Sequence, residues 1–232
     1  ADLDGQHRLG AAREQPQQHD RGLIFYEDFD LVADWRARFF EYGAQEGSFV
    51  WAQQDGLNGG AMRCQFEKGQ VSAGSLRVLF GENPFGRGLR QEETFREICW
   101  RVYVKHELGW EGNPAKLARA TCLAGRDWNQ GFIAHVWGGK SEVFCIDPAT
   151  GIRDRRKVTT RYNDFPNLKW LGLRQGQTPV FGPAESGRWV CVESHVKLNS
   201  PGERNGVFEL WVDGKLEAAR NDLDWHGSWG EY

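Results

Sequence analysis

The 232-residue sequence has no apolar run long enough to cross a bilayer and no excess of basic residues. A membrane-spanning helix needs about 20 consecutive apolar residues, so we expect no membrane partner. The formal net charge of -3 also excludes the basic stripe with which proteins neutralise phosphates, so we expect no nucleic-acid partner. No feature of the sequence requires a second subunit, and we expect a monomer.

The five cysteines include no Cys-x-x-Cys pair, which removes the usual zinc and redox motifs. Their odd number leaves at least one thiol free. Cys99 and Cys191 lie inside strand patterns, where a free thiol behaves as a small apolar side chain. A disulfide between Cys122 and Cys145 is one option that the sequence leaves open. The redox compartment is therefore undecided by cysteine usage.

Helical signals are also scarce. One methionine stands against 29 glycines and 11 tryptophans, a balance that favours strands and turns. The sequence shows no alternation of helical and strand patterns, which a doubly wound fold needs, and no repeat of fixed period. Hydrophobic residues make up 40% of the chain, enough for a packed core. These features together predict an all-β protein.

The clearest pattern is a β-hairpin over residues 188–220. Residues 189–198 alternate with period two, which predicts a strand with two different environments. Valines occupy one face, whereas Trp189, Glu193, His195 and Lys197 share the other. Residues 199–206 are rich in turn formers, residues 207–212 return, and Asp213-Gly214 predicts a second tight turn.

Residues 95–106 form a second strand of the same kind. Its apolar face contains Ile98, Trp100, Val102 and Val104, and its other face contains Glu97, Cys99, Arg101, Tyr103 and Lys105. Because both strands combine acids, bases and aromatics on one side, we expect them to be neighbours with a shared functional face. An ordinary wet sheet face, with Arg101 paired to Glu97 or Glu193, is the simpler interpretation.

Three further segments contain residues of interest. Residues 131–137 predict a central strand with His135 and Trp137 on one face. Residues 147–151 read as a turn, followed by a basic cluster at residues 153–157 that suits either a solvated loop or an acidic polymer. The long segment 161–183 contains Tyr162, and long aromatic loops tend to be functional.

The chain ends suggest the domain limits. Residues 1–21 are polar and read as a flexible arm, and residues 22–232 as a single domain. Ala1 suits a residue left after cleavage of a secretion signal. Residues 222–232 contain no recognisable last strand, so a chain that continues beyond them is one interpretation. Glu27, Asp28 and Asp30 offer hard oxygen ligands for a structural calcium ion, although turn acids look the same.

Several of these segments resemble the concanavalin A-like jelly-roll superfamily. They are the FYEDFD opening, the strand ICWRVYVKHELGW, and the hairpin GRWVCVESHVKLNSPGERNGVFELWVDGKL. Within that superfamily the chain is similar to the jelly-roll polysaccharide lyases of the glucuronan and alginate types and to a fungal cellulose-induced protein. The Glu-x-Asp-x-x-Glu signature of the jelly-roll glucanases is missing, which removes the carboxylate pair of a retaining glycosidase.

The resemblance implies a jelly-roll β-sandwich of two antiparallel sheets with a concave groove, in a secreted or periplasmic protein. It implies an enzyme that cleaves an acidic polysaccharide by β-elimination. That reaction needs a cation to neutralise the sugar carboxylate, a base for the adjacent proton and an acid for the leaving oxygen. The candidate for the cation is Arg101, the candidate bases are His135 and His195, and the candidate acids are Tyr103 and Tyr162.

Binding of the polymer is assigned to a wider set of residues. Its members are charged or aromatic side chains on the predicted strands and loops: Lys105, Lys116, Lys197, Glu193, Trp110, Trp137 and Trp189. The same set suits a second hypothesis, a non-catalytic carbohydrate-binding module or lectin, because apolar sugar faces stack on aromatic rings. A third hypothesis is a structural sandwich that binds no sugar at all.

Overall fold

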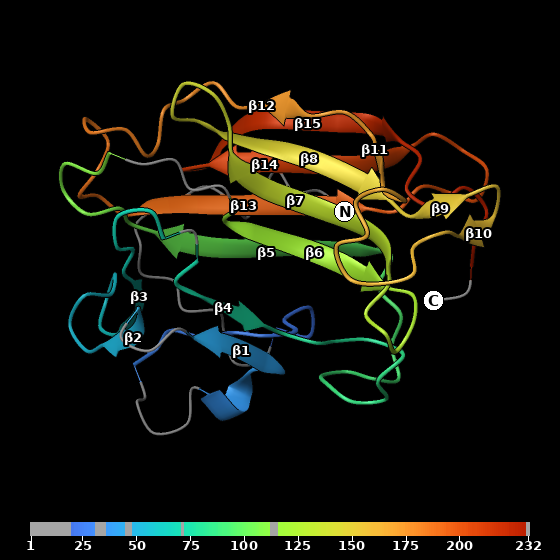
Figure 1. The fold of residues 1–232 in the computed structure, drawn as a ribbon, viewed down its shortest axis with the longest axis horizontal. Helices are drawn as coiled ribbons and strands as arrows, with labels where there is room; N and C mark the ends of the chain where they lie inside the picture. The colour runs from blue at the N-terminus through green and yellow to red at the C-terminus, as the bar shows by residue number, and fades with distance from the viewer. Residues whose placement is uncertain (1–19, 31–35, 45–47, 71, 112–115, 231–232) are drawn as a thin grey trace. The chain divides into compact units, whose positions relative to one another are not determined.

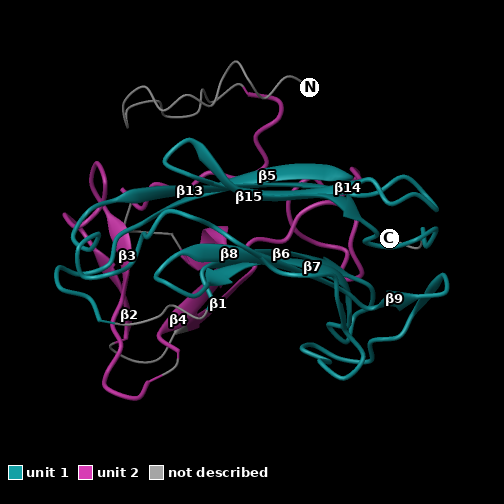
Figure 2. Ribbon diagram, turned by 90° about the horizontal axis from the view of Figure 1, so that it is seen from above, with its two compact units in different colours: residues 1–9, 95–232 teal, residues 10–94 magenta. Residues whose placement is uncertain are grey.

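The computed structural model describes residues 20–30, 36–44, 48–70, 72–111 and 116–230. The chain forms two compact units that divide between residues 94 and 95 (Figure 2). The larger unit contains the described residues from 95 onward, and the smaller unit contains those from 20 to 94. Apart from residues 20 and 21, the predicted N-terminal arm lies outside the described residues.

The larger unit is a β-sandwich of two antiparallel sheets, as predicted, and Figures 1 and 2 show the two layers. The four-stranded sheet has the order β15 (Lys215–Leu223), β14 (Gly206–Val212), β13 (Val190–Lys197) and β5 (Glu97–Val104). In the five-stranded sheet, β7 (Gln130–Gly138) lies between β6 (Ala118–Leu123) and β8 (Phe144–Thr150). The short strands β11 (Lys169–Trp170) and β12 (Arg174–Gln175) pair with the other edge of β8.

Alternation along the strands builds the core between the sheets. In β7, β8, β13, β14 and β15, one face contributes apolar side chains to a single buried cluster, and the apolar faces of β5 and β6 pack against it. The prediction that residues 95–106 and 189–197 are neighbours is confirmed, since β5 and β13 pair with Arg101 opposite Glu193. Each large side chain buried in this way stabilises the fold by about 1.5–3 kcal/mol.

A buried tryptophan near the C-terminal end joins the two sheets. Trp225 is fully buried and donates its indole N–H to the carbonyl of Lys197 at the end of β13. The hydroxyl of Thr150, at the end of β8, donates to the carbonyl of Trp225 at 2.6 Å. The segment after β15 therefore closes one end of the sandwich although it forms no strand of its own.

The predicted turn at Asp213-Gly214 is present. Both residues have positive φ, 49° and 79°, which matches the two-residue turn whose twist suits a hairpin. It joins β14 to β15. No helix among the described residues is long and apolar enough to span a bilayer.

The smaller unit contains two separate strand pairs. β1 (Glu41–Ala44) pairs with β4 (Gly74–Arg77), and β2 (Phe49–Ala52) pairs with β3 (Ala61–Cys64). β3 and β4 follow each other in the chain but do not pair with each other. Gln65 instead donates its backbone N–H to the carbonyl of Ser48, which extends the β2–β3 ladder. A short 3-10 turn spans Arg36–Arg38.

One buried carboxylate fastens β15 to the segment after β12. Glu217 accepts hydrogen bonds from the backbone N–H groups of Gln177 and Thr178 and from the Thr178 hydroxyl, and it pairs with Lys215 at 3.0 Å. Burial raises the pKa of Glu217, but these hydrogen bonds outweigh burial and lower the pKa to about 2.

Replacement of Glu217 tests this fastening. A pKa lower in the folded than in the unfolded chain stabilises the fold above about pH 4.3, and this contribution disappears as the pH falls toward 2. We expect Glu217→Gln to lower the free energy of unfolding by about 2 kcal/mol at pH 7, measured by urea denaturation. The difference from wild type should shrink between about pH 4.3 and pH 2. Glu203→Gln, in an exposed turn, is the matched control, and an equal effect of both variants would contradict the role of Glu217.

Candidate functional site

Two outward sheet faces present polar side chains. The ion-pair face is the outer face of β5, β13 and β14, with Glu97, Arg101, Glu193, His195 and Glu209. The ring face is the outer face of β6, β7, β8 and β11, defined here by Arg119, His135, Trp137, Asp147 and Trp170. Strand register places each set on its face. The residues predicted for catalysis are divided between the two faces, so they do not form one site.

Arg101 on the ion-pair face is already occupied by a carboxylate. Its Nε and Nη2 atoms donate to Oε1 of Glu193 at 2.9 and 2.6 Å. The Arg101 side chain is 39% exposed, whereas that of Glu193 is 13% exposed. This arrangement is the ordinary cross-strand ion pair that the sequence also allowed. To neutralise a sugar carboxylate, Arg101 must give up or share this partner.

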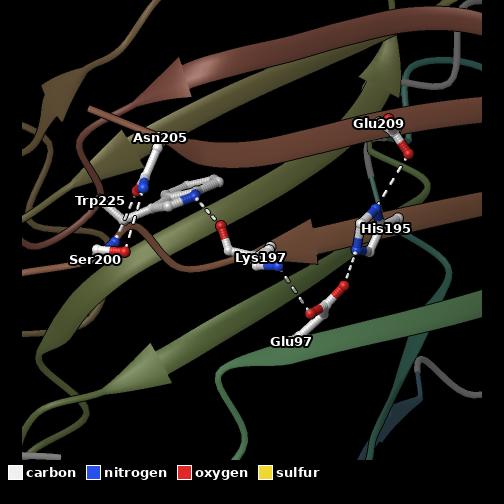
Figure 3. A network of polar contacts seen from close by, with 7 residues as sticks. All are labelled: Glu97, His195, Lys197, Ser200, Asn205, Glu209 and Trp225. Atoms are coloured by element: carbon white, nitrogen blue, oxygen red, sulfur yellow. Dashed lines mark hydrogen bonds and ion pairs between the residues drawn. The ribbon is translucent and has the colours of Figure 1, made fainter. Parts of the chain in front are cut away.

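His195 is held between two carboxylates on the same face (Figure 3). One ring nitrogen lies 2.8 Å from Glu97 and the other 3.1 Å from Glu209. Lys197 lies 3.5 Å from Glu97 in the same network. Both ring nitrogens are therefore engaged within the protein, and neither presents a lone pair to a bound sugar.

The remaining predicted residues on β5 and nearby segments also have partners. Tyr103 lies opposite Cys191, and burial raises the pKa of its hydroxyl. The Lys105 ammonium sits 5.1 Å from the centre of the Trp189 ring. Trp110 contacts the His106 ring, with centroids 5.3 Å apart. Cations on the ion-pair face are therefore matched by acids or rings within this face.

The ring face brings together residues of three neighbouring strands. Arg119 on β6 lies opposite His135 on β7, and His135 lies opposite Asp147 on β8. Directly opposed residues have Cβ atoms about 4.5–5.5 Å apart. Arg119 also lies over the Tyr162 ring, with its Cζ atom 4.8 Å from the ring centre, so the predicted acid Tyr162 and the predicted base His135 both neighbour Arg119. Lys116 is exposed two residues before β6 and acts on His135 through its charge.

His135 is held in one neutral form. Its Nδ1 atom lies 3.0 Å from the backbone carbonyl of Asp147, an acceptor, so Nδ1 carries the proton and Nε2 keeps its lone pair. Burial, opposed by this hydrogen bond and aided by the charges of Arg119 and Lys116, lowers the pKa of His135 to about 4. The ring is therefore neutral at pH 7, the form that a general base requires.

Aromatic rings gather around His135. The Trp137 ring stacks on it with centroids 4.5 Å apart and an interplanar angle of 6°. Trp170 lies 5.8 Å from Trp137 and 6.4 Å from Phe165. Trp170 and Phe165 are 39% and 48% exposed. Stacked and exposed rings of this kind suit the apolar faces of sugars.

Asp147 is a site residue that the sequence did not reveal. Residues 147–151 read as a turn because Asp, Pro and Gly are turn formers, but β8 continues through Pro148 to Thr150. The expected turn is therefore wrong, and the strand places the Asp147 side chain beside His135. Burial raises the pKa of this carboxyl to about 6. Arg119 was missed too, whereas Trp170 lies in the long aromatic segment 161–183 that was expected to be functional.

The three carboxylates predicted to bind calcium make hydrogen bonds or ion pairs with other residues of the chain. Glu27 accepts from the backbone N–H of Phe29 and pairs with Arg38, and Asp30 accepts from the N–H of Gly60. Asp28 accepts from the N–H of Asp30. No group of three or more His, Cys, Asp or Glu within the described ranges is placed to hold a metal ion. Calcium binding stays a prediction.

All five cysteines are free. The optional bridge between Cys122 and Cys145 is therefore not formed. Cys122 packs toward the core, whereas Cys145 pairs with Trp137 on the outward side of the same sheet, with β7 between the two strands.

Titration of Asp147 gives a testable prediction. A pKa raised by folding means that the folded chain holds its proton more tightly, so stability falls as the pH rises from about 3.9 to 6. We expect Asp147→Asn to raise the free energy of unfolding by about 1–2 kcal/mol at pH 7.5, with little effect at pH 4, in urea denaturation. Asp127→Asn, in an exposed turn, serves as control. A lower free energy of unfolding for Asp147→Asn than for the wild type at pH 7.5 would contradict the raised pKa of Asp147.

Comparisons with known proteins agree with this architecture. No family model and no curated protein sequence matches the chain. The structure is similar to the crystal structure of the marine PL-14 alginate lyase from Aplysia kurodai, with a TM-score of 0.55 and 15% identity over 88% of this chain and 82% of that chain. The chain therefore has a jelly-roll β-sandwich fold that it shares with a polysaccharide lyase.

Proposed function

We propose that the protein binds an acidic polysaccharide across the ring face and cleaves it by β-elimination. The observation that carries this proposal is the row Arg119–His135–Asp147, in which a cation lies opposite a neutral histidine on adjacent strands. The shared fold with an alginate lyase supports the same class of substrate.

The reaction assigns one task to each group. Arg119 and Lys116 neutralise the sugar carboxylate, which lowers the free energy of the carbanion that forms beside it. Nε2 of His135 takes the proton from the carbon next to the carboxylate. The electrons form a carbon–carbon double bond as the bond to the leaving sugar oxygen breaks, and the Tyr162 hydroxyl protonates that oxygen.

Asp147 supports binding in the same row. Its carboxyl makes no hydrogen bond within the described part of the chain, and its raised pKa favours the protonated form in weakly acidic solution. A protonated acid donates a hydrogen bond to a sugar carboxylate, whereas an ionised one repels it.

A non-catalytic carbohydrate-binding module is the second candidate, and one observation favours it. His135 is only 3% exposed, whereas a base must reach the carbon that it deprotonates. The rings exposed at the ring face are Trp170 and its stacked neighbour Phe165. These rings suffice to hold a sugar chain without any reaction.

Measurement of the unsaturated product distinguishes the lyase from the binding module, and the ring face from the ion-pair face. Incubation with a panel of polyuronides, followed by absorbance of the unsaturated uronide, should show product with the wild type. We expect Arg119→Gln and His135→Asn to lower the rate by about 100-fold or more. Arg101→Gln is the matched arginine on the ion-pair face. Loss of product with Arg101→Gln and not with Arg119→Gln would move the site to that face, and binding without any product would support the module.

Trp170 tests binding alone. We expect Trp170→Ala to weaken retardation in gels that contain the polyuronide, with an affinity loss of about tenfold, because a stacking ring is lost. Phe66→Ala, an exposed aromatic of the smaller unit, is the control. Unchanged retardation of the Trp170 variant would exclude the ring face as the binding surface.

A further inference from the structure

The basic cluster at residues 153–157 lies in a tight hairpin. β9 (Ile152–Arg153) and β10 (Arg156–Lys157) pair antiparallel, with Arg153 opposite Arg156. The tip residues Asp154 and Arg155 both have positive φ, 47° and 63°, which defines a tight two-residue hairpin turn. The base of the hairpin is fixed, because Ile152 is buried in the core and Val158 donates its N–H to the carbonyl of Gly151.

The charge of this hairpin is not compensated locally. Residues 153–157 contain four basic side chains and one acidic one, a net charge of +3. Arg153, Arg155 and Arg156 are exposed. None of the four cations takes part in an ion pair within the described segments; Arg153 and Lys157 instead donate to the backbone carbonyls of Asn167 and Ala124. Cations of the ion-pair face, by contrast, are matched by acids.

The hairpin continues directly from a strand of the ring face. β8 contains Asp147, and only Gly151 separates its end from β9. Six residues lead from Asp147 to Arg153, which corresponds to about 20 Å of extended chain. Arg153 also holds the loop that leads to Trp170, through Asn167. Leu168 of this loop covers Ala149 and Ile133 on the outer face between Asp147 and the hairpin. A polymer bound at Asp147 therefore reaches the hairpin by passing over the loop, about 20 Å away.

We infer that the β9–β10 hairpin is a distal subsite that binds further carboxylate groups of the same acidic polysaccharide. This inference rests on the proposed function for its substrate class. Guanidinium groups suit the task because they form paired hydrogen bonds with carboxylates. The subsite raises the affinity for long chains. It does not change the affinity for short fragments, because these reach only the ring face.

The test compares the wild type with the double variant Arg155→Gln/Arg156→Gln. Affinity is measured for an alginate polymer and for its trisaccharide at low and at high salt. We expect the double variant to bind the polymer about tenfold more weakly at low salt, with a shallower dependence on salt, and to bind the trisaccharide as the wild type does. Lys68→Gln/Lys140→Gln removes the same charge from exposed positions outside the hairpin and should leave both affinities unchanged.

The other outcomes separate this inference from the proposed function. Equal polymer affinity of the hairpin variant and the wild type would overturn the subsite, while a loss with Trp170→Ala would still support the ring face. A loss with the hairpin variant and none with Trp170→Ala would retain the subsite and overturn the proposed function. An equal loss of affinity for double-stranded DNA would show a general polyanion surface and overturn the assignment to polysaccharide.

Discussion

The structure of the larger unit depends on the alternation of side chains along paired strands. Each long strand of the two main sheets gives one face to a common core, so the other face is free to differ in chemistry. Register then fixes which outward residues meet. A shift of β7 by one residue would turn His135 into the core and expose its apolar neighbours. The chemistry of both outward faces is thus a consequence of how the apolar residues are packed.

The two faces use this freedom in different ways. On the ion-pair face, Arg101 pairs with Glu193 and Lys197 with Glu97, and both ring nitrogens of His195 bond to carboxylates, so these polar groups satisfy one another. Exposed pairs of this kind each contribute about 0–1 kcal/mol to stability. On the ring face, one cation, a neutral imidazole and a carboxyl of raised pKa lie in a row among aromatic rings. The second arrangement places a carboxyl that makes no hydrogen bond within the described ranges beside a neutral imidazole, which is why the proposed chemistry is placed there.

Much of the sandwich was predictable from period-two patterns. The neighbouring positions of β5 and β13, the central strand β7 and the turn at Asp213-Gly214 all follow from local signals. The site was less predictable, because alternation shows that residues share a side of one strand but not which sheet that strand joins. Arg101 and His135 therefore looked like members of one set. Asp147 was hidden by the turn-forming residues after it, since the pairing of β8 with β7 overrides their local preference.

The pKa of His135 is lowered and that of Asp147 is raised, which has a consequence for spectroscopy. Histidine is the side chain that ordinarily titrates near neutral pH. In this protein the ring on β7 gains its proton only near pH 4, and the carboxyl opposite it changes charge near pH 6. An ionisation near pH 6 at this face, followed for instance by tryptophan fluorescence, is therefore assigned to Asp147, which becomes negatively charged as the pH rises. It is not assigned to a histidine that loses its positive charge.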